Sequence, residues 1–461
     1  MSTFGEEPRS IDPIFLKHGL EKKTSAILFD FTSNRIVSSH NANLRLPLAS
    51  VTKAVTAIYG LETIGPDYKF ETNLYKDGVI REGKLIGDLY LLGGGDPSLS
   101  TKKLYNFVEK LKGMGLEEIK GNFFYSPGIV PEFVSIDPDQ LPEVSYNPGF
   151  SGLNLNENKV FFKWRNAGSS YNVSLISNGQ KPNFSPENIE ISSVNTGTAI
   201  YRYFANSSTK EESWIVLQKA LGKSGSRSLP VRFSAAYTAN AFKSLCSQES
   251  ILVPKPQEAM EYPYKGSLIA RLESKALIEI VKEMLSRSTN VTAEVIGLFA
   301  GKTWGSESES LSDSGSLMSE WFDYVSGTKG AVMKNHSGLS ADSRVSTSQF
   351  LQFLNRDSTK KILPKLLKKH RLYGSQKYEL SNSEISVVAK TGTMHFNRCL
   401  AGYIMVQGEA KASFAIFCAD IDKRKLIKPH GLANPPGAKA WLKRSRVQEN
   451  HLLSSWAKMY L

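Results

Sequence analysis

The sequence predicts an α+β protein in which one domain, made of two chain segments, encloses a large β-rich insertion. Apolar residues at helical spacing are frequent before residue 69 and again after residue 262. The stretch between them consists mainly of short alternating segments separated by Asn, Ser, Gly and Pro. We therefore expect a discontinuous domain of residues 1–68 and 263–461, with an inserted β-rich region, 69–262, of two nested subdomains.

Both segments of the first domain combine helices with strands. Its N-terminal part is expected to contain a helix over 13–20, strands over 25–30 and 36–38, and a helix over 50–64 that Gly65 and Pro66 end. Its C-terminal part is expected to contain helices over 275–285, 291–299, 317–324 and 347–354, strands over 400–406 and 413–418, and a helix over 447–460. In the insertion we expect strands over 84–92, 121–125, 160–164, 171–176, 198–204 and 214–217, and helices near 102–112 and 235–245.

The composition narrows the class of protein. Of the 461 residues, 41% are hydrophobic and 22% charged, as is usual for a globular chain of two or three domains. The formal net charge of +13 favours anionic partners, but no zinc-finger spacing or aromatic-interleaved motif indicates a nucleic acid. The three cysteines form no disulfide framework and no CxxC metal pair. No apolar run approaches the roughly 18–20 residues that span a bilayer, and the first residues lack the pattern of a signal peptide.

Ser50 and Lys53 interrupt an apolar run at the start of a predicted helix. Residues three apart on a helix share a face, so the lysine amine can reach the serine hydroxyl. The apolar neighbours favour a neutral amine with a lowered pKa, which can act as a general base on the serine. N–H groups at a helix start also suit an oxyanion. Because the same spacing occurs five more times in the chain, the alternative is a helix-capping serine beside a surface lysine.

Two further motifs suit a binding site. The segment Ala389–Thr393 contains Lys-Thr-Gly and follows the apolar run Ile385–Val388, so it is expected on a strand. Glycine there allows a ligand to approach the backbone, and the lysine and hydroxyls suit a carboxylate. The segment Ser288–Asn290 lies at a break between two helical patterns, where two short polar side chains can complete a site. The alternative for the Lys-Thr-Gly segment is a polar strand end. Ser-x-Asn also begins at Ser39, Ser145, Ser170 and Ser193, so this tripeptide alone is a weak signal.

In this order, Ser-x-x-Lys, Ser-x-Asn and Lys-Thr-Gly resemble the signature of penicillin-binding proteins and serine β-lactamases. Longer segments resemble the patterns GDLYLxGxGDP, SALNxNxN, GSGLSxxNRV and KTGT…LAGY of type-4 (class C) low-molecular-mass penicillin-binding proteins, peptidase family S13. In this chain they are residues 87–97, 151–158, 336–345, and 390–394 with 400–403. The resemblance covers residues 25–418, and the long insertion after the first motif is also typical of that family. Asn335-His336 stand where the family usually has Asp-Gly, so we expect altered loop contacts there and intact chemistry.

The resemblance implies the penicillin-binding transpeptidase or serine β-lactamase-like fold, an antiparallel sheet with helices on both faces. It implies that Ser50 is the nucleophile and Lys53 its base. Ser288 is then expected to relay a proton to the leaving amine, with Lys53 and Lys390 tuning it. Asn290 is expected to form a hydrogen bond with the substrate amide and to hold Lys53 in place. The other residues expected to bind substrate are Thr391, Gly392, Thr393, Met394, Tyr146 and Phe150; for Tyr146, Phe150 and Met394 the alternative is core or loop packing.

The activity implied is that of a D,D-carboxypeptidase or D,D-endopeptidase acting on peptidoglycan stem peptides, with β-lactams as covalent inhibitors and no metal or organic cofactor. Such enzymes work outside the cytoplasmic membrane, so a signal peptide is expected to have been removed. One alternative is a serine β-lactamase, although no Glu-x-x-Leu-Asn-like loop is present. Another is an inactive scaffold that binds cell-wall peptides. The sequence leaves open the balance of the two peptidase activities, the preferred diamino acid, peripheral contact with the envelope and a homodimer.

Overall fold

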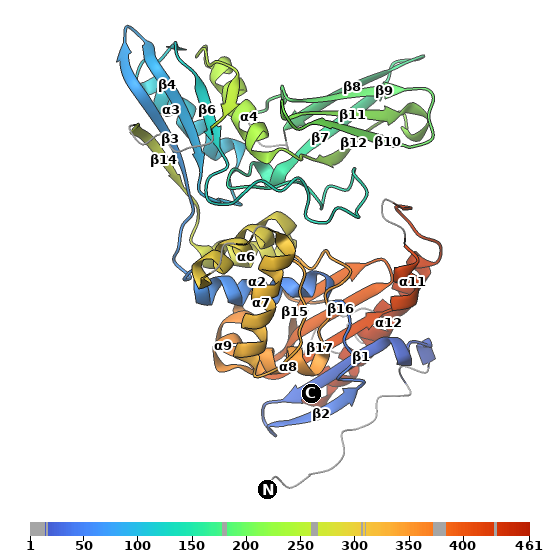
Figure 1. Ribbon diagram of the computed structural model, residues 1–461. Helices are drawn as coiled ribbons and strands as arrows, with labels where there is room; N and C mark the ends of the chain where they lie inside the picture. Colours follow the sequence, from blue (N-terminus) through green and yellow to red (C-terminus); the bar gives the residue numbers. More distant parts are fainter. Residues whose placement is uncertain are drawn as a thin grey trace. The chain divides into compact units, whose positions relative to one another are not determined.

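The computed structural model describes residues 14, 17–177, 182–259, 266–305, 308, 310–371, 384–427 and 431–461. The chain forms two compact units, residues 1–66 with 281–461 and residues 67–280 (Figure 1). The second boundary lies later than the expected residue 263, because strand β14 (Ser267–Glu273) pairs with β3 (Glu71–Arg81) of the second unit. The helix expected over 13–20 lies partly outside the described residues.

The first unit is built on an antiparallel sheet of five strands in the order β15-β16-β17-β1-β2. The strands are β1 (Thr24–Asp30), β2 (Arg35–His40), β15 (Ile385–Met394), β16 (Asn397–Val406) and β17 (Glu409–Ala419). Strand β1 pairs with β17, so the N-terminal and C-terminal segments share one sheet. This arrangement confirms the predicted α+β class.

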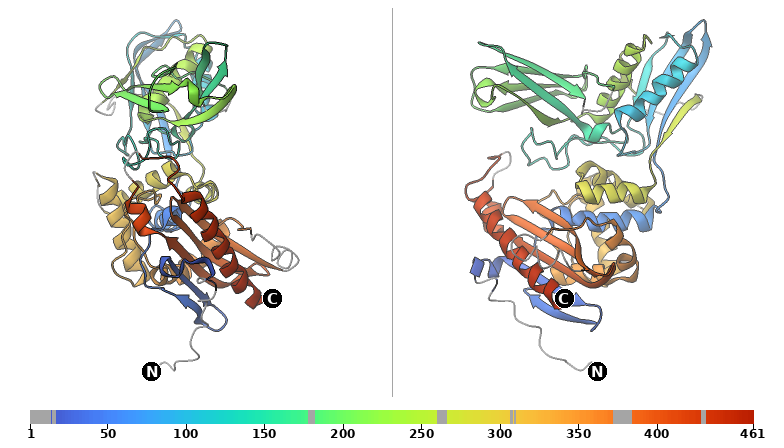
Figure 2. Two further views of the ribbon diagram at one scale, coloured as in Figure 1. Left: turned by 90° about the vertical axis from the view of Figure 1, so that its right-hand side faces the viewer. Right: turned by 180° about the vertical axis from the view of Figure 1, so that it is seen from behind.

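Helices cover both faces of this sheet, because side chains on a strand alternate between the two faces. Helix α12, dark red in Figure 2, runs along one face. There Phe414 of β17 lies against Trp456 of this helix. On the other face, Phe417 meets Phe350 of helix α8. The helices and short turns of this unit are η1 (Glu21–Lys23), η2 (Ala49–Val51), α2 (Thr52–Thr63), α6 (Asn290–Trp304), α7 (Leu311–Ser326), α8 (Thr347–Asn355), α9 (Asp357–Leu366), α11 (Ile421–Lys425), α12 (Ala438–Ala457) and η5 (Lys458–Tyr460). Helix α5 (Leu277–Arg287) crosses the boundary between the units.

The second unit contains one large sheet and two small ones. The large sheet has the order β13-β6-β4-β3-β14, with β5 beside β4, and the small sheets have the orders β10-β11-β9 and β12-β7-β8. Its further elements are β4 (Lys84–Gly93), α3 (Thr101–Gly113), β5 (Glu118–Ile119), β6 (Phe123–Ser126), η3 (Asn156–Asn158), β7 (Lys159–Asn166), β8 (Tyr171–Ser177), β9 (Ile189–Val194), β10 (Tyr201–Asn206), β11 (Glu211–Leu217), η4 (Gln218–Ala220), β12 (Ser224–Pro230), α4 (Ser234–Gln248) and β13 (Pro256–Glu258). One buried cluster includes Phe123 of the large sheet, Phe162 and Trp214 of the small sheets, and Phe242 of α4. The division into two nested subdomains stays a prediction.

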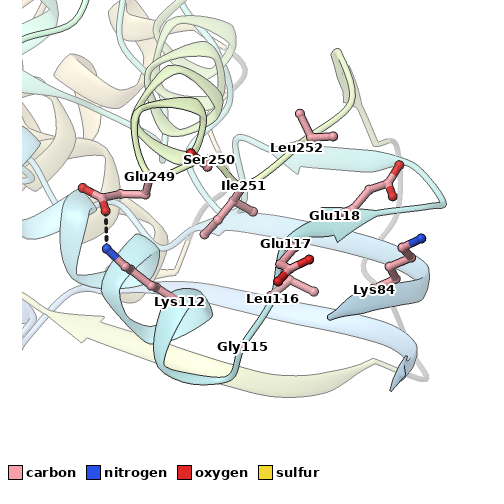
Figure 3. A pocket seen from close by; sticks show the side chains of 10 residues that line it. All are labelled: Lys84, Lys112, Gly115, Leu116, Glu117, Glu118, Glu249, Ser250, Ile251 and Leu252. Carbon is pink, nitrogen blue, oxygen red and sulfur yellow. Dashed lines mark hydrogen bonds and ion pairs between the residues drawn. The ribbon is translucent and has the colours of Figure 1, made fainter. Parts of the chain in front are cut away.

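A groove in the second unit lies beside the C-terminal ends of α3 and α4 (Figure 3). Its lining carries charges of both signs, and Lys112 and Glu249 form an ion pair of 2.6 Å across it. It contains none of the residues predicted to form the site. In the described part of the chain, no helix combines the length and apolar character needed to cross a membrane.

Candidate active site

Ser50 lies in the turn η2, immediately before helix α2 begins at Thr52. The helix therefore starts two residues later than expected, after a tighter 3-10 turn. Ala49, the residue before the serine, has a φ of 46°, a conformation that residues with a side chain rarely adopt. Such backbone strain is concentrated at functional sites. The turn leaves Ser50 partly exposed while its neighbours Ala49 and Val51 are buried.

Lys53 lies one turn further along and is fully buried. Its Nζ atom is 3.0 Å from Ser50 Oγ and donates to the carbonyl oxygen of Ser337 at 2.8 Å. Burial, followed by the positive charge of Lys390, holds the pKa of the Lys53 amine well below its usual value, although Glu294 opposes the shift. Burial therefore favours the neutral form of an amine that lies within hydrogen-bonding distance of the serine, and it excludes the alternative of a surface lysine.

A buried carboxylate supports this pair from behind. Glu294 of α6 accepts hydrogen bonds from the backbone N–H groups of His336 at 3.0 Å and Ser337 at 2.9 Å. Burial raises the pKa of the Glu294 carboxyl, while these hydrogen bonds favour its charged form. Glu294 thus fixes the loop whose Ser337 carbonyl binds Lys53.

Ser288 and Lys390 form a second serine–lysine pair. Ser288 follows α5 with a φ of 60°, and its Oγ accepts a hydrogen bond of 2.9 Å from Lys390 Nζ. Lys390 is 2% exposed, and burial together with the charge of Arg398 lowers its pKa to about 8. Asn290 begins α6 two residues after Ser288 and one turn before Glu294.

Gly392 brings strand β15 close to Ser50. A Cβ atom at this position would lie 2.6 Å from the carbonyl oxygen of Leu48 and 3.0 Å from the nitrogen of Ser50. Any side chain would therefore separate β15 from η2. The glycine explains why the Lys-Thr-Gly motif and Ser50 meet although more than three hundred residues separate them in the sequence.

Strand β15 forms an edge of its sheet, and the segment 368–370 covers only part of that edge. Ala389 donates to this segment at 3.0 Å and Val387 accepts from it at 2.8 Å. Groups that face one edge of an antiparallel strand recur at every second residue. The N–H groups of Thr391 and Thr393 therefore point toward the same edge, beyond the covered part.

The side chains of the motif lie on opposite faces of β15. Lys390 turns toward Ser288, whereas the hydroxyl of Thr393 accepts a hydrogen bond from Arg398 at 2.9 Å. Met394 follows on the same strand, next to Arg424 of α11. A ligand at the edge of β15 would have the lysine on one side and Thr393 on the other.

Two residues of the second unit were also expected to bind substrate. Phe150 has no exposed surface and stacks on Phe133 with ring centroids 5.1 Å apart, so its side chain is a packing residue in this structure. The expectation that it contacts substrate is corrected on that ground. Tyr146 is 47% exposed, and its hydroxyl donates to Gln140 at 3.2 Å; its role stays a prediction.

Asn335 and His336, which stand where the family usually has Asp-Gly, are both buried, and the expected change in loop contacts stays a prediction. The imidazole of His336 is buried between α6 and α7, with Nε2 2.8 Å from Ser314 Oγ. A Cβ atom on Gly297 of α6 would overlap this ring, so the helix approaches the histidine closely. Burial lowers the pKa of His336 to about 3.

Sequence reasoning assigned no role to four residues that contact the site. Glu294 carried a usable signal, since it stands four residues after Asn290 on one helix face in an otherwise apolar stretch. Ser337 acts through its backbone carbonyl, which no residue type reveals. Arg398 and Glu449 are joined by two hydrogen bonds, but they are remote in sequence and belong to no recognised motif.

A five-stranded antiparallel sheet, with a serine–lysine pair at a helix start beside its edge strand, is the arrangement of the penicillin-binding and serine β-lactamase-like fold. The crystal structure of penicillin binding protein 4 (dacB) from Haemophilus influenzae, complexed with a novel β-lactam, has this fold: its TM-score to this chain is 0.73 at 19% identity, over 97% of this chain and 99% of that one. A predatory endopeptidase of Bdellovibrio bacteriovorus, Bd0816, gives a TM-score of 0.50 at 14% identity, over 94% and 93% of the two chains.

The family model described as the D-Ala-D-Ala carboxypeptidase 3 (S13) family matches residues 8–429, and the chain belongs to this family. A relative, the D-alanyl-D-alanine carboxypeptidase DacB of Haemophilus influenzae, is 23% identical over 282 residues. That match spans 58% of this chain and 56% of the relative, little more than half of its length.

Proposed function

We propose that the protein is a serine D,D-peptidase that cleaves the D-Ala-D-Ala terminus or the D-Ala cross-bridges of peptidoglycan stem peptides. The observation that carries this proposal is the 3.0 Å contact between the fully buried Lys53 Nζ and the partly exposed Ser50 Oγ. A desolvated amine with a lowered pKa is neutral and can accept the serine proton. Membership of the S13 family and the activity for which its relative is named support the same chemistry.

Acylation begins when Ser50 Oγ attacks the carbonyl carbon of the penultimate D-alanine and its proton passes to Lys53 Nζ. The peptide C–N bond then breaks, and the leaving amine takes a proton from Ser288. Lys390, which donates to the Ser288 oxygen at 2.9 Å, stabilises that oxygen as its proton leaves. Ser288 regains a proton from the protonated Lys53, which leaves that amine neutral again. Water then attacks the ester and gives up one proton to Lys53, and this proton passes to Ser50 Oγ as the ester bond breaks and the shortened peptide is released.

Backbone N–H groups supply the oxyanion site in this proposal. The N–H of Ser50 lies at the start of α2, and that of Thr393 points outward from the edge of β15. Donors aimed at a developing oxyanion contribute about 10²–10³-fold each to the rate. The C-terminal carboxylate of the substrate would lie against Lys390, Thr391 and Thr393, with Asn290 bonding the substrate amide and Met394 as an outer contact. The role expected of Tyr146 stays a prediction.

β-Lactams are proposed as covalent inhibitors, because their ring carbonyl meets the same serine. The solved structure of a relative was obtained with a β-lactam. We also propose that the enzyme acts outside the cytoplasmic membrane, where its polymer is found, and that the net charge of +13 suits an anionic envelope. Peripheral envelope contact and a homodimer stay predictions.

The proposal is tested by digesting purified linear pentapeptide muropeptides and cross-linked dimers, with D-alanine release and dimer loss followed by chromatography. Wild-type protein should release D-alanine, cleave dimers, or do both, and the Ser50→Ala variant should do neither. Ser358→Ala is a matched control, because this serine also precedes a lysine by three residues but bonds Glu62 elsewhere in the unit. If wild-type protein leaves both substrates intact but binds them, the scaffold alternative replaces the proposal. Rapid release of hydrolysed penicillin with intact muropeptides would instead assign a β-lactamase.

A further inference from the structure

Arg398 links the Lys-Thr-Gly-Thr strand to the last helix of the chain. It lies on β16 directly opposite Thr393 of β15. Its guanidinium forms a two-pronged ion pair with Glu449 of α12, with Nε and Nη2 at 2.8 and 2.6 Å from the two carboxylate oxygens. The two residues are 8% and 4% exposed. This geometry fixes the plane and the direction of the guanidinium.

The other terminal nitrogen of the Arg398 guanidinium, Nη1, faces Thr393 of the Lys-Thr-Gly-Thr strand. It donates to Thr393 Oγ1 at 2.9 Å. A guanidinium has only donors, so the threonine oxygen must act as the acceptor. The hydroxyl proton of Thr393 is then directed to a different acceptor. Thr393 is exposed at the edge of β15, where a ligand can supply that acceptor.

We propose that Arg398, held by Glu449, is a positioning residue that makes the Thr393 hydroxyl a hydrogen-bond donor to the C-terminal carboxylate of the substrate. This inference rests on the proposed function and adds a specificity device to it. Glu449 balances the charge of Arg398. The pair therefore orients the Thr393 hydroxyl and adds no net positive charge to the site. Lys390 supplies the positive charge on the opposite face of the strand.

A purely structural ion pair would not require the third contact. Buried ion pairs contribute little net stability, because desolvation offsets their attraction. Here one terminal nitrogen of the Arg398 guanidinium donates a hydrogen bond to the exposed hydroxyl of Thr393, within the Lys-Thr-Gly-Thr motif. A lysine at position 398 could carry the charge but could not hold both the carboxylate of Glu449 and the hydroxyl in one plane.

The test compares acylation of the full chain by benzylpenicillin, which has a free carboxylate, and by its methyl ester. In wild-type protein the acid should react faster than the ester. Arg398→Gln, Arg398→Lys and Glu449→Gln should each slow the acid about tenfold or more, as expected for a hydrogen bond to a charged group, and leave the ester unchanged. Thr393→Val should produce the same loss of selectivity, Thr393→Ser should retain it, and Arg398→Gln combined with Thr393→Val should be no worse than either alone.

Arg356→Gln is the matched control, because Arg356 pairs with Glu62 at 3.2 Å in the same unit without contacting the motif. It should change the melting temperature and leave the acid-to-ester ratio unchanged. The proposal is overturned if the Arg398 and Glu449 variants slow both compounds equally, or if the acid-to-ester ratio stays at its wild-type value. If neither compound acylates wild-type protein, the proposed function is wrong, and this result does not decide the role of Arg398. The inference is then judged by calorimetric binding of a D-Ala-D-Ala peptide and its C-terminal amide, and it is wrong if Arg398→Gln leaves their affinity ratio unchanged.

Discussion

Lys53 Nζ lies 3.0 Å from Ser50 Oγ, on a side chain with no exposed surface. Burying a lysine in this position is costly for the fold, because the charged amine loses its hydration. The same loss lowers the pKa of the amine and favours its neutral form. The protein nevertheless buries a lysine here, with its amine facing Ser50. The relationship therefore points to chemistry rather than stability.

Replacing Lys53 by methionine should lower the rate of acylation of Ser50 by benzylpenicillin about 10²–10⁴-fold, the usual contribution of a general base. The folded state should be at least as stable, because an apolar side chain of similar length replaces a buried amine. Stopped-flow acylation and thermal unfolding give the two quantities. Lys103→Met is the matched control: Lys103 has the same spacing from Ser100 but pairs with Asp96 in the second unit, so acylation should not change. Full acylation of the Lys53 variant would show that this amine is not the base.

Glu294→Gln should slow acylation roughly tenfold or more, because a glutamine can accept only one of the two hydrogen bonds that fix His336 and Ser337. Glu212 offers a matched control in the second unit. It is a buried carboxylate that accepts hydrogen bonds from the backbone of Arg232 and Phe233. Glu212→Gln should reduce the melting temperature without changing acylation per folded molecule. Equal effects of the two variants on acylation would contradict the positioning role of Glu294.

Lys390 should make stability depend on pH in the alkaline range. Its pKa is about 8 in the folded protein, and about 10.4 in an unfolded chain. Between these values the unfolded chain binds one more proton, so this group makes the free energy of unfolding rise with pH. The difference between wild type and Lys390→Met, measured by urea unfolding from pH 7 to 10.5, should therefore increase with pH above about 8. A difference that stays flat or falls would mean that Lys390 is charged throughout.

His336 should make the free energy of unfolding depend on pH in the acid range. Here too the unfolded chain binds one more proton than the folded chain. Its pKa is about 3 in the folded protein, against about 6.5 when unfolded. The free energy of unfolding contributed by this group should thus be fully present above pH 6.5 and lost as the pH falls toward 3. Unfolding of His336→Asn should lack this dependence, whereas His40→Asn, on strand β2, provides a histidine substitution outside the site. If wild type and His336→Asn respond identically to acid, the buried neutral imidazole is not the cause.

Much of this site was accessible from the sequence, for reasons that particular residues illustrate. Ser50, Lys53 and the Lys-Thr-Gly run stand in local patterns whose helix and strand settings can be read from hydrophobic periodicity. The edge position of β15 and its approach to η2 depend on long-range pairing, which periodicity does not encode. Helix α12 begins at Ala438 rather than at 447, because Trp441 and Ser445 continue its buried face through a strongly basic stretch. Strands such as β12, Ser-Gly-Ser-Arg-Ser-Leu-Pro, were missed because pairing with β7, and not their own propensity, fixes them.

The most direct test of the central claim is mass spectrometry of peptides from the protein after incubation with benzylpenicillin. The account predicts one penicilloyl adduct, on the peptide that contains Ser50, and its absence in Ser50→Ala. An adduct that persists in Ser50→Ala, or folded wild-type protein that shows neither an adduct nor penicillin turnover, would contradict the assignment of Ser50 as the nucleophile.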